Sequence, residues 1–135
     1  MNQTTSKIRV LLVDDDPSQL ELIDTAIGSV DNSFTFETAN SADRALELIH
    51  KQPFDCIVSN YIMPRMNGLE LCEKLRAERC ETPFILFTCH DDQKVVERAF
   101  TVGVDHFLGK EPNLAIYGEL AQQIKSLVMR RRTAG

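Results

Sequence analysis

Short apolar runs alternate with segments of helical spacing along the whole chain. Five of the runs are interpreted as strands, at residues 8–13, 34–39, 56–58, 84–87 and 106–108. Runs such as 8–13 are typical of strands buried on both faces of a parallel sheet. The intervening segments repeat apolar residues every three or four positions, which predicts five helices. The fourth is expected to turn four side chains inward: Val95, Val96, Ala99 and Phe100.

Five strand–helix pairs with short connections predict a three-layer α/β fold. Because crossovers between parallel strands are right-handed, the helices should cover both faces of a doubly wound sheet. The flavodoxin-like strand order 2-1-3-4-5 is expected by analogy with other small doubly wound folds. We assign a disordered N-terminus to residues 1–7, one domain to 8–129, and a polar C-terminal tail to 130–135.

Composition narrows the class of protein. The chain has 135 residues, of which 43% are hydrophobic and 26% charged, as in a globular protein with a single core. Its net charge of −5 argues against direct binding of nucleic acid. The sequence has no apolar run long enough for a membrane span and no signal peptide, so we expect a cytoplasmic protein without membrane contact. The four cysteines are scattered, which favours reduced thiols over zinc or disulfides.

Polar residues lie at the ends of four of the predicted strands. They are Asp14 and Asp15 after the first, Asn60 after the third, Thr88 after the fourth and Lys110 after the fifth. These strands are neighbours in the expected order, so the side chains should converge at one edge of the sheet. Two carboxylates beside an amide oxygen suit Mg²⁺, and Lys and Thr side chains can bind phosphoryl oxygens. Each residue alone has a plainer explanation as a cap, a turn or a solvated charge.

Four motifs together make the chain resemble the receiver domains of two-component response regulators over nearly its whole length. The motifs are Val-Asp-Asp-Asp-Pro at 13–17, Met-Pro-Arg-Met-Asn-Gly at 63–68, Phe-Thr-Cys at 87–89 and Gly-Val-Asp-His-Phe-Leu-Gly-Lys at 103–110. The resemblance implies a non-enzymatic signalling module of a phosphorelay. Its partners would be a sensor histidine kinase or a downstream signalling protein, and it would be a monomer or a weak dimer.

The resemblance also implies roles for single residues. The magnesium ligands would be Asp14, Asp15, the residue at position 60 and the backbone carbonyl of Ile62. Thr88 and Lys110 would sense the phosphoryl group. Phe107 would be the switch aromatic on the output face, which the fourth helix, fifth strand and fifth helix form.

The chain departs from the family pattern at the residue that accepts phosphate, which is Asn60 instead of Asp. A carboxamide is not a competent nucleophile at neutral pH, so position 60 should not be phosphorylated. Losing one carboxylate also predicts weak or absent Mg²⁺ binding. Glu111 separates Lys110 from Pro112, where many receivers have proline directly after the lysine. Either a natural pseudo-receiver or an introduced Asp-to-Asn substitution explains Asn60, and Glu111 favours the natural variant.

Two other functions fit parts of the sequence. Residues 13–18 also match the first motif of haloacid-dehalogenase phosphatases, in which Asp14 would be the nucleophile and Asp16 the general acid. The chain lacks that family's late acidic pair and its insert after the first strand. A degenerate receiver kept as a scaffold is the second alternative. A flavodoxin is excluded, because the acidic cluster would repel the phosphate of a flavin.

Overall fold

Five strands and five helices alternate in a computed structural model that describes residues 7–90 and 92–134. The strands are β1 (Ile8–Val13), β2 (Phe34–Ala39), β3 (Cys56–Ser59), β4 (Phe84–Thr88) and β5 (His106–Gly109). The helices are α1 (Pro17–Gly28), α2 (Ala42–Lys51), α3 (Gly68–Ala77), α4 (Gln93–Thr101) and α5 (Ala115–Ala134). None of the described helices combines the length and apolar character needed to span a bilayer.

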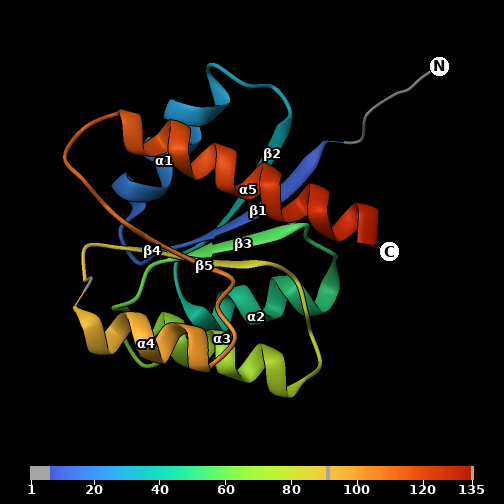
Figure 1. Ribbon diagram of the computed structural model, residues 1–135, viewed down its shortest axis with the longest axis vertical. Helices are drawn as coiled ribbons and strands as arrows, with labels where there is room; N and C mark the ends of the chain where they lie inside the picture. The colour runs from blue at the N-terminus through green and yellow to red at the C-terminus, as the bar shows by residue number, and fades with distance from the viewer. Residues whose placement is uncertain (1–6, 91, 135) are drawn as a thin grey trace.

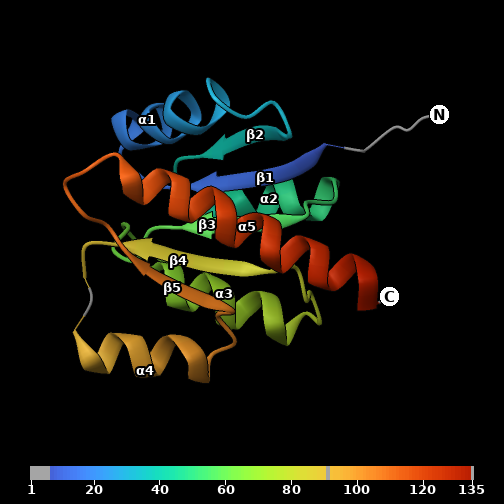
Figure 2. The same ribbon diagram turned by 45° about the horizontal axis from the view of Figure 1, so that its top comes forward.

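All five strands are parallel, in the order β2-β1-β3-β4-β5, as predicted from the sequence. β1 lies between β2 and β3, so that Val10 pairs with Phe36 on one side and Cys56 on the other. Figures 1 and 2 show α1 and α5 on one face of this sheet and α2, α3 and α4 on the other. The doubly wound, three-layer α/β fold is confirmed.

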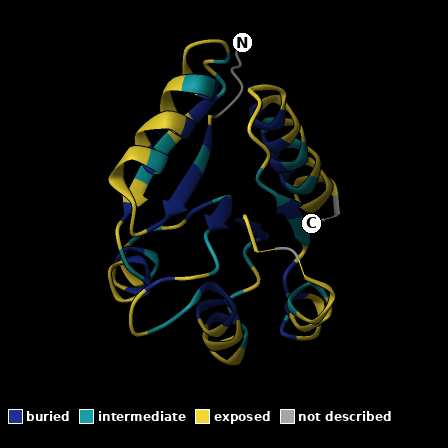
Figure 3. Cartoon of the chain, turned by 90° about the vertical axis from the view of Figure 1, so that its left-hand side faces the viewer, coloured by how far each residue is buried: buried dark blue, intermediate teal, exposed yellow. Residues whose placement is uncertain are grey.

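The sheet separates two hydrophobic cores. Leu11 of β1 belongs to the core under α2, α3 and α4, whereas its neighbour Leu12 belongs to the core under α1 and α5. Both side chains are fully buried, because helices cover both faces of the sheet. Figure 3 shows buried strands between helices whose outer faces are exposed. Burial on both sides explains why the first strand is apolar at every position except Arg9.

Four helices begin at a residue whose side chain accepts a hydrogen bond from a backbone N–H of the first turn: Asp16, Ser41, Asn67 and Asp92. Such caps satisfy backbone donors that have no partner within the helix. Asn67 and Glu70 form a reciprocal capping box that sets the start of α3.

The Arg76 side chain joins the C-terminal ends of α3 and α4. Its Nε and Nη2 atoms donate to the carbonyl of Gly103 at 3.1 and 2.9 Å, and Nη1 donates to the carbonyls of Cys80 and Thr82. Nη2 also pairs with Asp105 at 3.0 Å. Gly103 has a φ of +104°, and a Cβ there would lie 2.8 Å from Cγ of Arg76. The turn after α4 therefore requires glycine and is held to α3.

The C-terminal segment is polar and exposed and lies within the last helix. The residues assigned to a polar tail, 130–135, are helical as far as Ala134, because α5 continues through the arginines. Arg131 donates to the carbonyl of Glu81 at 2.6 Å, and Arg132 pairs with Asp55 at 3.5 Å. Residues 1–6, where we expected disorder, lie outside the described residues.

All four cysteines are free, as predicted. Cys56 and Cys72 are buried among apolar side chains, Cys80 is half-buried and Cys89 is exposed. Burial raises the pKa of the Cys72 thiol to about 11. The two buried cysteines therefore pack as small hydrophobic residues.

Candidate functional site

The carboxyl edge of the sheet brings together three of the side chains singled out in the sequence: Asp14, Asn60 and Lys110. Asp14 follows β1, and Asn60 follows the neighbouring strand β3. The backbone N–H of Asn60 donates to the carbonyl of Val13 at 2.9 Å. Lys110 reaches across from the end of β5, and its Nζ lies 3.2 Å from Oδ2 of Asp14. Strand order alone accounts for this convergence.

Asp14 is a nearly buried carboxylate, with 4% of its surface exposed. Burial raises the pKa of this carboxyl, since removal from water disfavours the charged form. The backbone N–H of Asp16, which donates to Oδ1 at 3.0 Å, and the ammonium of Lys110 act in the opposite direction. Neighbouring Asp15 adds a smaller upward contribution to the pKa. Lys110 is therefore the main positive charge that compensates Asp14.

The Asn60 side chain is directed into its own loop. Nδ2 donates a hydrogen bond to the backbone carbonyl of Ile62 at 2.9 Å. The carbonyl can only accept, so the NH₂ end of the amide must face it. A carboxylate at this position could not make the bond, because an ionised Asp has no donor. The amide therefore occupies one of the carbonyl oxygens that the family resemblance assigns to the metal.

Gly68 and Ser59 hold the backbone of Asn60 in place. Ser59 donates through Oγ to the carbonyl of Asn60 at 2.9 Å, while the N–H of Gly68 donates to the carbonyl of Tyr61 at 2.8 Å. A Cβ on Gly68 would lie 2.2 Å from the Asn60 carbonyl oxygen, closer than any real contact. The start of α3 can pack against the site loop only because residue 68 has no side chain.

The three aspartates after β1, at positions 14–16, have different surroundings. Asp14 points into the pocket, Asp15 is exposed, and Asp16 is the exposed N-cap of α1, where it accepts the N–H of Ser18 at 3.0 Å. Asp14 is thus the one member of the cluster that contacts Lys110. The sequence alone, with three consecutive aspartates, could not show which of them contacts the lysine and which caps the helix.

Thr88 is fully buried at the end of β4, and its hydroxyl is directed to the following loop. Oγ1 accepts the backbone N–H of His90 at 3.2 Å and lies 3.4 Å from its ring Nδ1. The His90 ring also packs edge-on against Tyr61, with ring centroids 6.1 Å apart. The sequence analysis did not assign His90 and Tyr61 to the site. The Thr-x-His spacing directly after a strand is the signal that could have identified His90.

Lys110 and Phe107 connect the site to β5. Besides its contact with Asp14, the Lys110 ammonium lies 5.4 Å from the centre of the Phe87 ring, a favourable cation–π arrangement. Its backbone N–H donates to the carbonyl of Thr88 at 2.9 Å. Phe107 is half-buried and packs against the core under α2, α3 and α4. Position 107 is therefore linked along one short strand to the lysine at the site.

Two of the four predicted magnesium ligands already have partners within the chain, whereas Asp15 is exposed. Oδ2 of Asp14 is paired with Lys110, and the Ile62 carbonyl accepts the Asn60 amide. Among residues 7–90 and 92–134, no three His, Cys, Asp or Glu side chains are grouped so that they could hold a metal ion. Mg²⁺ bound here would share Oδ2 of Asp14 with the Lys110 ammonium and the Ile62 carbonyl with the Asn60 amide.

Comparisons with known proteins show which domain family this chain matches. Residues 10–120 match the model of the response regulator receiver domain. The chain is 30% identical, over 125 residues, to the response regulator MprA of Mycobacterium leprae, covering 93% of this chain and 53% of that protein. It thus spans about half the length of the curated relatives it matches.

Two solved structures show the same fold. The receiver domain of the Francisella response regulator 1452 is 27% identical, with a TM-score of 0.83 and coverage of 93% of this chain and 99% of that one. A CheY-like receiver domain protein from Methanospirillum hungatei is 25% identical, with a TM-score of 0.84 and coverage of 96% and 100%.

Proposed function

Since the chain belongs to the response regulator receiver domains, the signalling modules of phosphorelays, we propose that it is a receiver that is not phosphorylated at its central position. Asn60 lies where the family places the acceptor Asp. Phosphorylation would require a carboxylate oxygen to attack phosphorus, and the amide of Asn60 offers no such nucleophile. The domain then acts by protein–protein contact in one persistent state.

The observation that carries the proposal is the hydrogen bond from Asn60 Nδ2 to the Ile62 carbonyl. It gives the amide a structural role that Asp could not perform. Together with the Asp14–Lys110 pair, it gives the Asp14 carboxylate and the Asn60 amide partners within the chain. Asn60 thus stabilises the unphosphorylated pocket as well as lacking the reactive group.

The same bonds bear on the metal. We propose that any Mg²⁺ is bound weakly, through Asp14, Asp15, the oxygen of Asn60 and the Ile62 carbonyl. One ligand charge fewer than in a standard receiver lowers the attraction for the ion. Exchange of the Lys110 and Asn60 hydrogen bonds adds a further cost.

The remaining assignments extend the family pattern to this chain. Thr88 and Lys110 hold the positions that sense a phosphoryl group, and Phe107 that of the switch aromatic. We propose a sensor histidine kinase or a downstream signalling protein in the cytoplasm as the partner, without direct contact to nucleic acid or membrane. The free chain is a monomer or a weak dimer.

Intact mass spectrometry tests the central claim. The wild type and an Asn60→Asp variant are incubated with Mg²⁺ and acetyl phosphate. In the variant, a carboxylate oxygen attacks phosphorus, the bond to the acetyl oxygen breaks, and acetate leaves. We expect one added phosphoryl group on Asn60→Asp and none on the wild type. Asn60→Gln is the matched control, because it keeps an amide and should also stay unlabelled.

Two other results would change the interpretation. A labelled wild type refutes the proposal, and peptide mapping would then identify the acceptor, with Asp14 and Asp15 as the nearest carboxylates. If neither protein is labelled, the pocket has lost more than its acceptor, and the scaffold interpretation is favoured. A Mg²⁺ titration followed by thermal unfolding separates these cases, since Asn60→Asp should gain more stability from the ion than the wild type.

The phosphatase alternative receives no support from the geometry or from the matches described above. It requires Asp16 as a general acid beside Asp14. Asp16 instead caps α1 and is directed to the N–H of Ser18.

A further inference from the structure

The Thr88 hydroxyl, at the end of β4, makes two contacts with a single residue, His90. Thr88 is fully buried. Its Oγ1 accepts the backbone N–H of His90 at 3.2 Å and lies 3.4 Å from Nδ1 of the same residue's ring. A hydroxyl carries one proton, so it can donate only one hydrogen bond at a time. When Nδ1 is unprotonated, that proton is directed to His90.

The His90 ring is held beside Thr88 by a second contact. It packs edge-on against the ring of Tyr61, with centroids 6.1 Å apart and an angle of 71° between the ring planes. This arrangement is favourable for aromatic rings. Tyr61 is half-buried and packs against the core under α2, α3 and α4, and its carbonyl accepts the N–H of Gly68 at 2.8 Å. The exposed residue His90 is therefore restrained by Tyr61 on one side and by Thr88 on the other.

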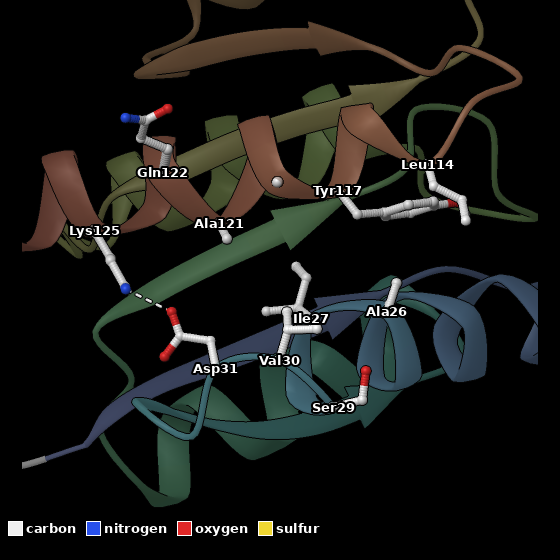
Figure 4. Close-up of a pocket in the computed structure, with 11 residues that line it drawn as sticks. Ala26, Ile27, Ser29, Val30, Asp31, Leu114, Tyr117, Ala121, Gln122 and Lys125 are labelled. Atoms are coloured by element: carbon white, nitrogen blue, oxygen red, sulfur yellow. Dashed lines mark ion pairs between the residues drawn. The ribbon is translucent and has the colours of Figure 1, made fainter.

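The preceding side chain of β4 offers a comparison on the opposite face of the sheet. Phe87 packs edge-on against Tyr117 of α5, with ring centroids 6.1 Å apart. Figure 4 shows Tyr117 lining a groove between α5 and α1. The Tyr117 hydroxyl accepts a hydrogen bond from Nε2 of Gln19 at 3.4 Å. This contact is as long as the one between the Thr88 hydroxyl and the His90 ring, but it lies outside the polar site and provides a matched control.

A phosphoryl group would compete with His90 for the Thr88 proton. Under the function proposed above, on which this inference rests, Thr88 holds the position that senses a phosphoryl group. To bind a phosphoryl oxygen as a donor, the hydroxyl must turn its one proton away from His90. A hydrogen bond to an ionised oxygen is stronger than one between neutral groups, so the phosphoryl group has the advantage. His90 reduces that advantage without cancelling it.

We propose that His90 is a positioning residue that holds the Thr88 hydroxyl in its unphosphorylated arrangement, as a second restraint independent of Asn60. Asn60 removes the group that would be phosphorylated, whereas His90 weakens the response that would follow. Asn60→Asp should therefore restore phosphorylation but only part of the movement of Thr88. Removing the ring nitrogen of His90 should restore the rest.

Proton–nitrogen NMR of the full chain tests the direction of the hydrogen bond, because it reports which ring nitrogen carries the proton. At about pH 8, above the ordinary pKa of histidine, we expect the His90 proton on Nε2, with Nδ1 as the acceptor. Thr88→Val removes the hydroxyl and should shift the Nδ1 signal, whereas Tyr117→Phe should leave it in place. A ring protonated on Nδ1 refutes the proposal, because it would donate to the hydroxyl and leave the hydroxyl proton free. An Nδ1 signal that does not respond to Thr88→Val also refutes it.

Variants of His90 in the Asn60→Asp background test the effect on the response. The Thr88 methyl signal, recorded with and without Mg²⁺ and acetyl phosphate, reports the populations of the two side-chain positions. His90→Phe keeps a ring to pack against Tyr61 but has no acceptor. We expect it to raise the ratio of moved to unmoved Thr88 in the phosphorylated protein roughly threefold to tenfold, the factor for one net hydrogen bond. His90→Asn, whose Oδ1 can replace Nδ1 as the acceptor, should leave the ratio near that of the histidine.

Failure of this proposal and failure of the proposed function give different results. If intact mass spectrometry shows no label on Asn60→Asp, the proposed function fails, and the NMR measurement on the wild type still decides whether His90 binds the Thr88 proton. If Asn60→Asp is labelled and the Phe and Asn variants of His90 respond alike, the ring nitrogen has no role and the proposal is refuted.

Discussion

Lys110→Met removes the positive charge that faces Asp14 and leaves the length of the side chain almost unchanged. Asp14 is then a buried carboxylate without a counter-ion. Its charged form is already disfavoured by burial, and Lys110 opposes that effect. We therefore expect the variant to be less stable than the wild type at neutral pH, with most of the loss due to Asp14.

The geometry sets the size of this loss. Two unit charges 3.2 Å apart attract by about 5 kcal/mol at an effective dielectric constant near 20. Breaking a buried pair typically costs about 3–5 kcal/mol. Two effects reduce the loss. The Met side chain does not carry the desolvation cost of a buried ammonium, and the ion pair lies at an edge of the sheet, close to solvent. We expect Lys110→Met to lower the free energy of unfolding by about 3 kcal/mol at pH 7.

The loss should depend on pH in a defined direction. Without Lys110, the pKa of Asp14 rises further above its ordinary value. As the pH falls through this raised pKa, the folded variant takes up a proton, and the uncompensated charge disappears. The difference between wild type and variant is therefore largest at neutral pH and shrinks in acid.

Urea unfolding at several pH values between about 8 and 5 measures the difference, within the range where native carboxylates otherwise stay ionised. Asp14→Asn and the double variant complete the cycle. The double variant should recover much of the loss, with a coupling energy of about 2 kcal/mol. A loss that is independent of pH, or single effects that simply add, would refute the assignment of Lys110 as the partner of Asp14.

Two further predictions concern glycine and surface charge. Gly68→Ala should lower the free energy of unfolding by at least about 3 kcal/mol, because its Cβ would meet the Asn60 carbonyl at 2.2 Å. Gly118→Ala should raise the free energy of unfolding by up to about 1 kcal/mol. Urea unfolding measures both changes, and effects of the same sign would contradict this prediction. Asp31→Asn should cost about 0.2–1 kcal/mol at pH 7, because hydrogen bonds from Lys125 and Ser33 lower the pKa of Asp31 to about 2. That stability is present above the ordinary pKa of 3.8 and is lost as the pH falls through about 2, so thermal midpoints of the two proteins should converge in acid.

The fold could be predicted because its strands carry a strong signal. β1 is buried on both faces, so its sequence from Val10 to Val13 is wholly apolar and Arg9 is its one polar residue. The positions of the site residues followed from strand order. Apolar spacing was less informative for α4, where Phe100 was expected to face inward and is 52% exposed. Ala99 is the one buried residue of that helix, and the pattern could not separate a core side chain from an exposed one.

The orientation of the site side chains could not be predicted in this way. The Asn60 amide bonds to a carbonyl two residues later, which depends on the path of a loop. The hydroxyl of Thr88 accepts the backbone N–H of His90, which likewise depends on the path of a loop. The contacts of Arg131 and Arg132 join α5 to residues fifty or more positions earlier, Glu81 and Asp55. Local sequence contains no information on such distant partners.

The contacts of Arg76 determine how α4 can move. They hold the C-terminal end of this helix to α3 through the carbonyl of Gly103, whereas its N-terminal end follows the loop that carries Thr88 and His90. One end of α4 is thus anchored at the amino edge of the sheet, and the other lies next to the polar site. A rotation of α4 about this anchored end would keep the hydrogen bonds of Arg76 intact. Small shifts of the Thr88 loop would produce their largest movement at the first turn of α4, and Phe100, near the anchor, would hardly move.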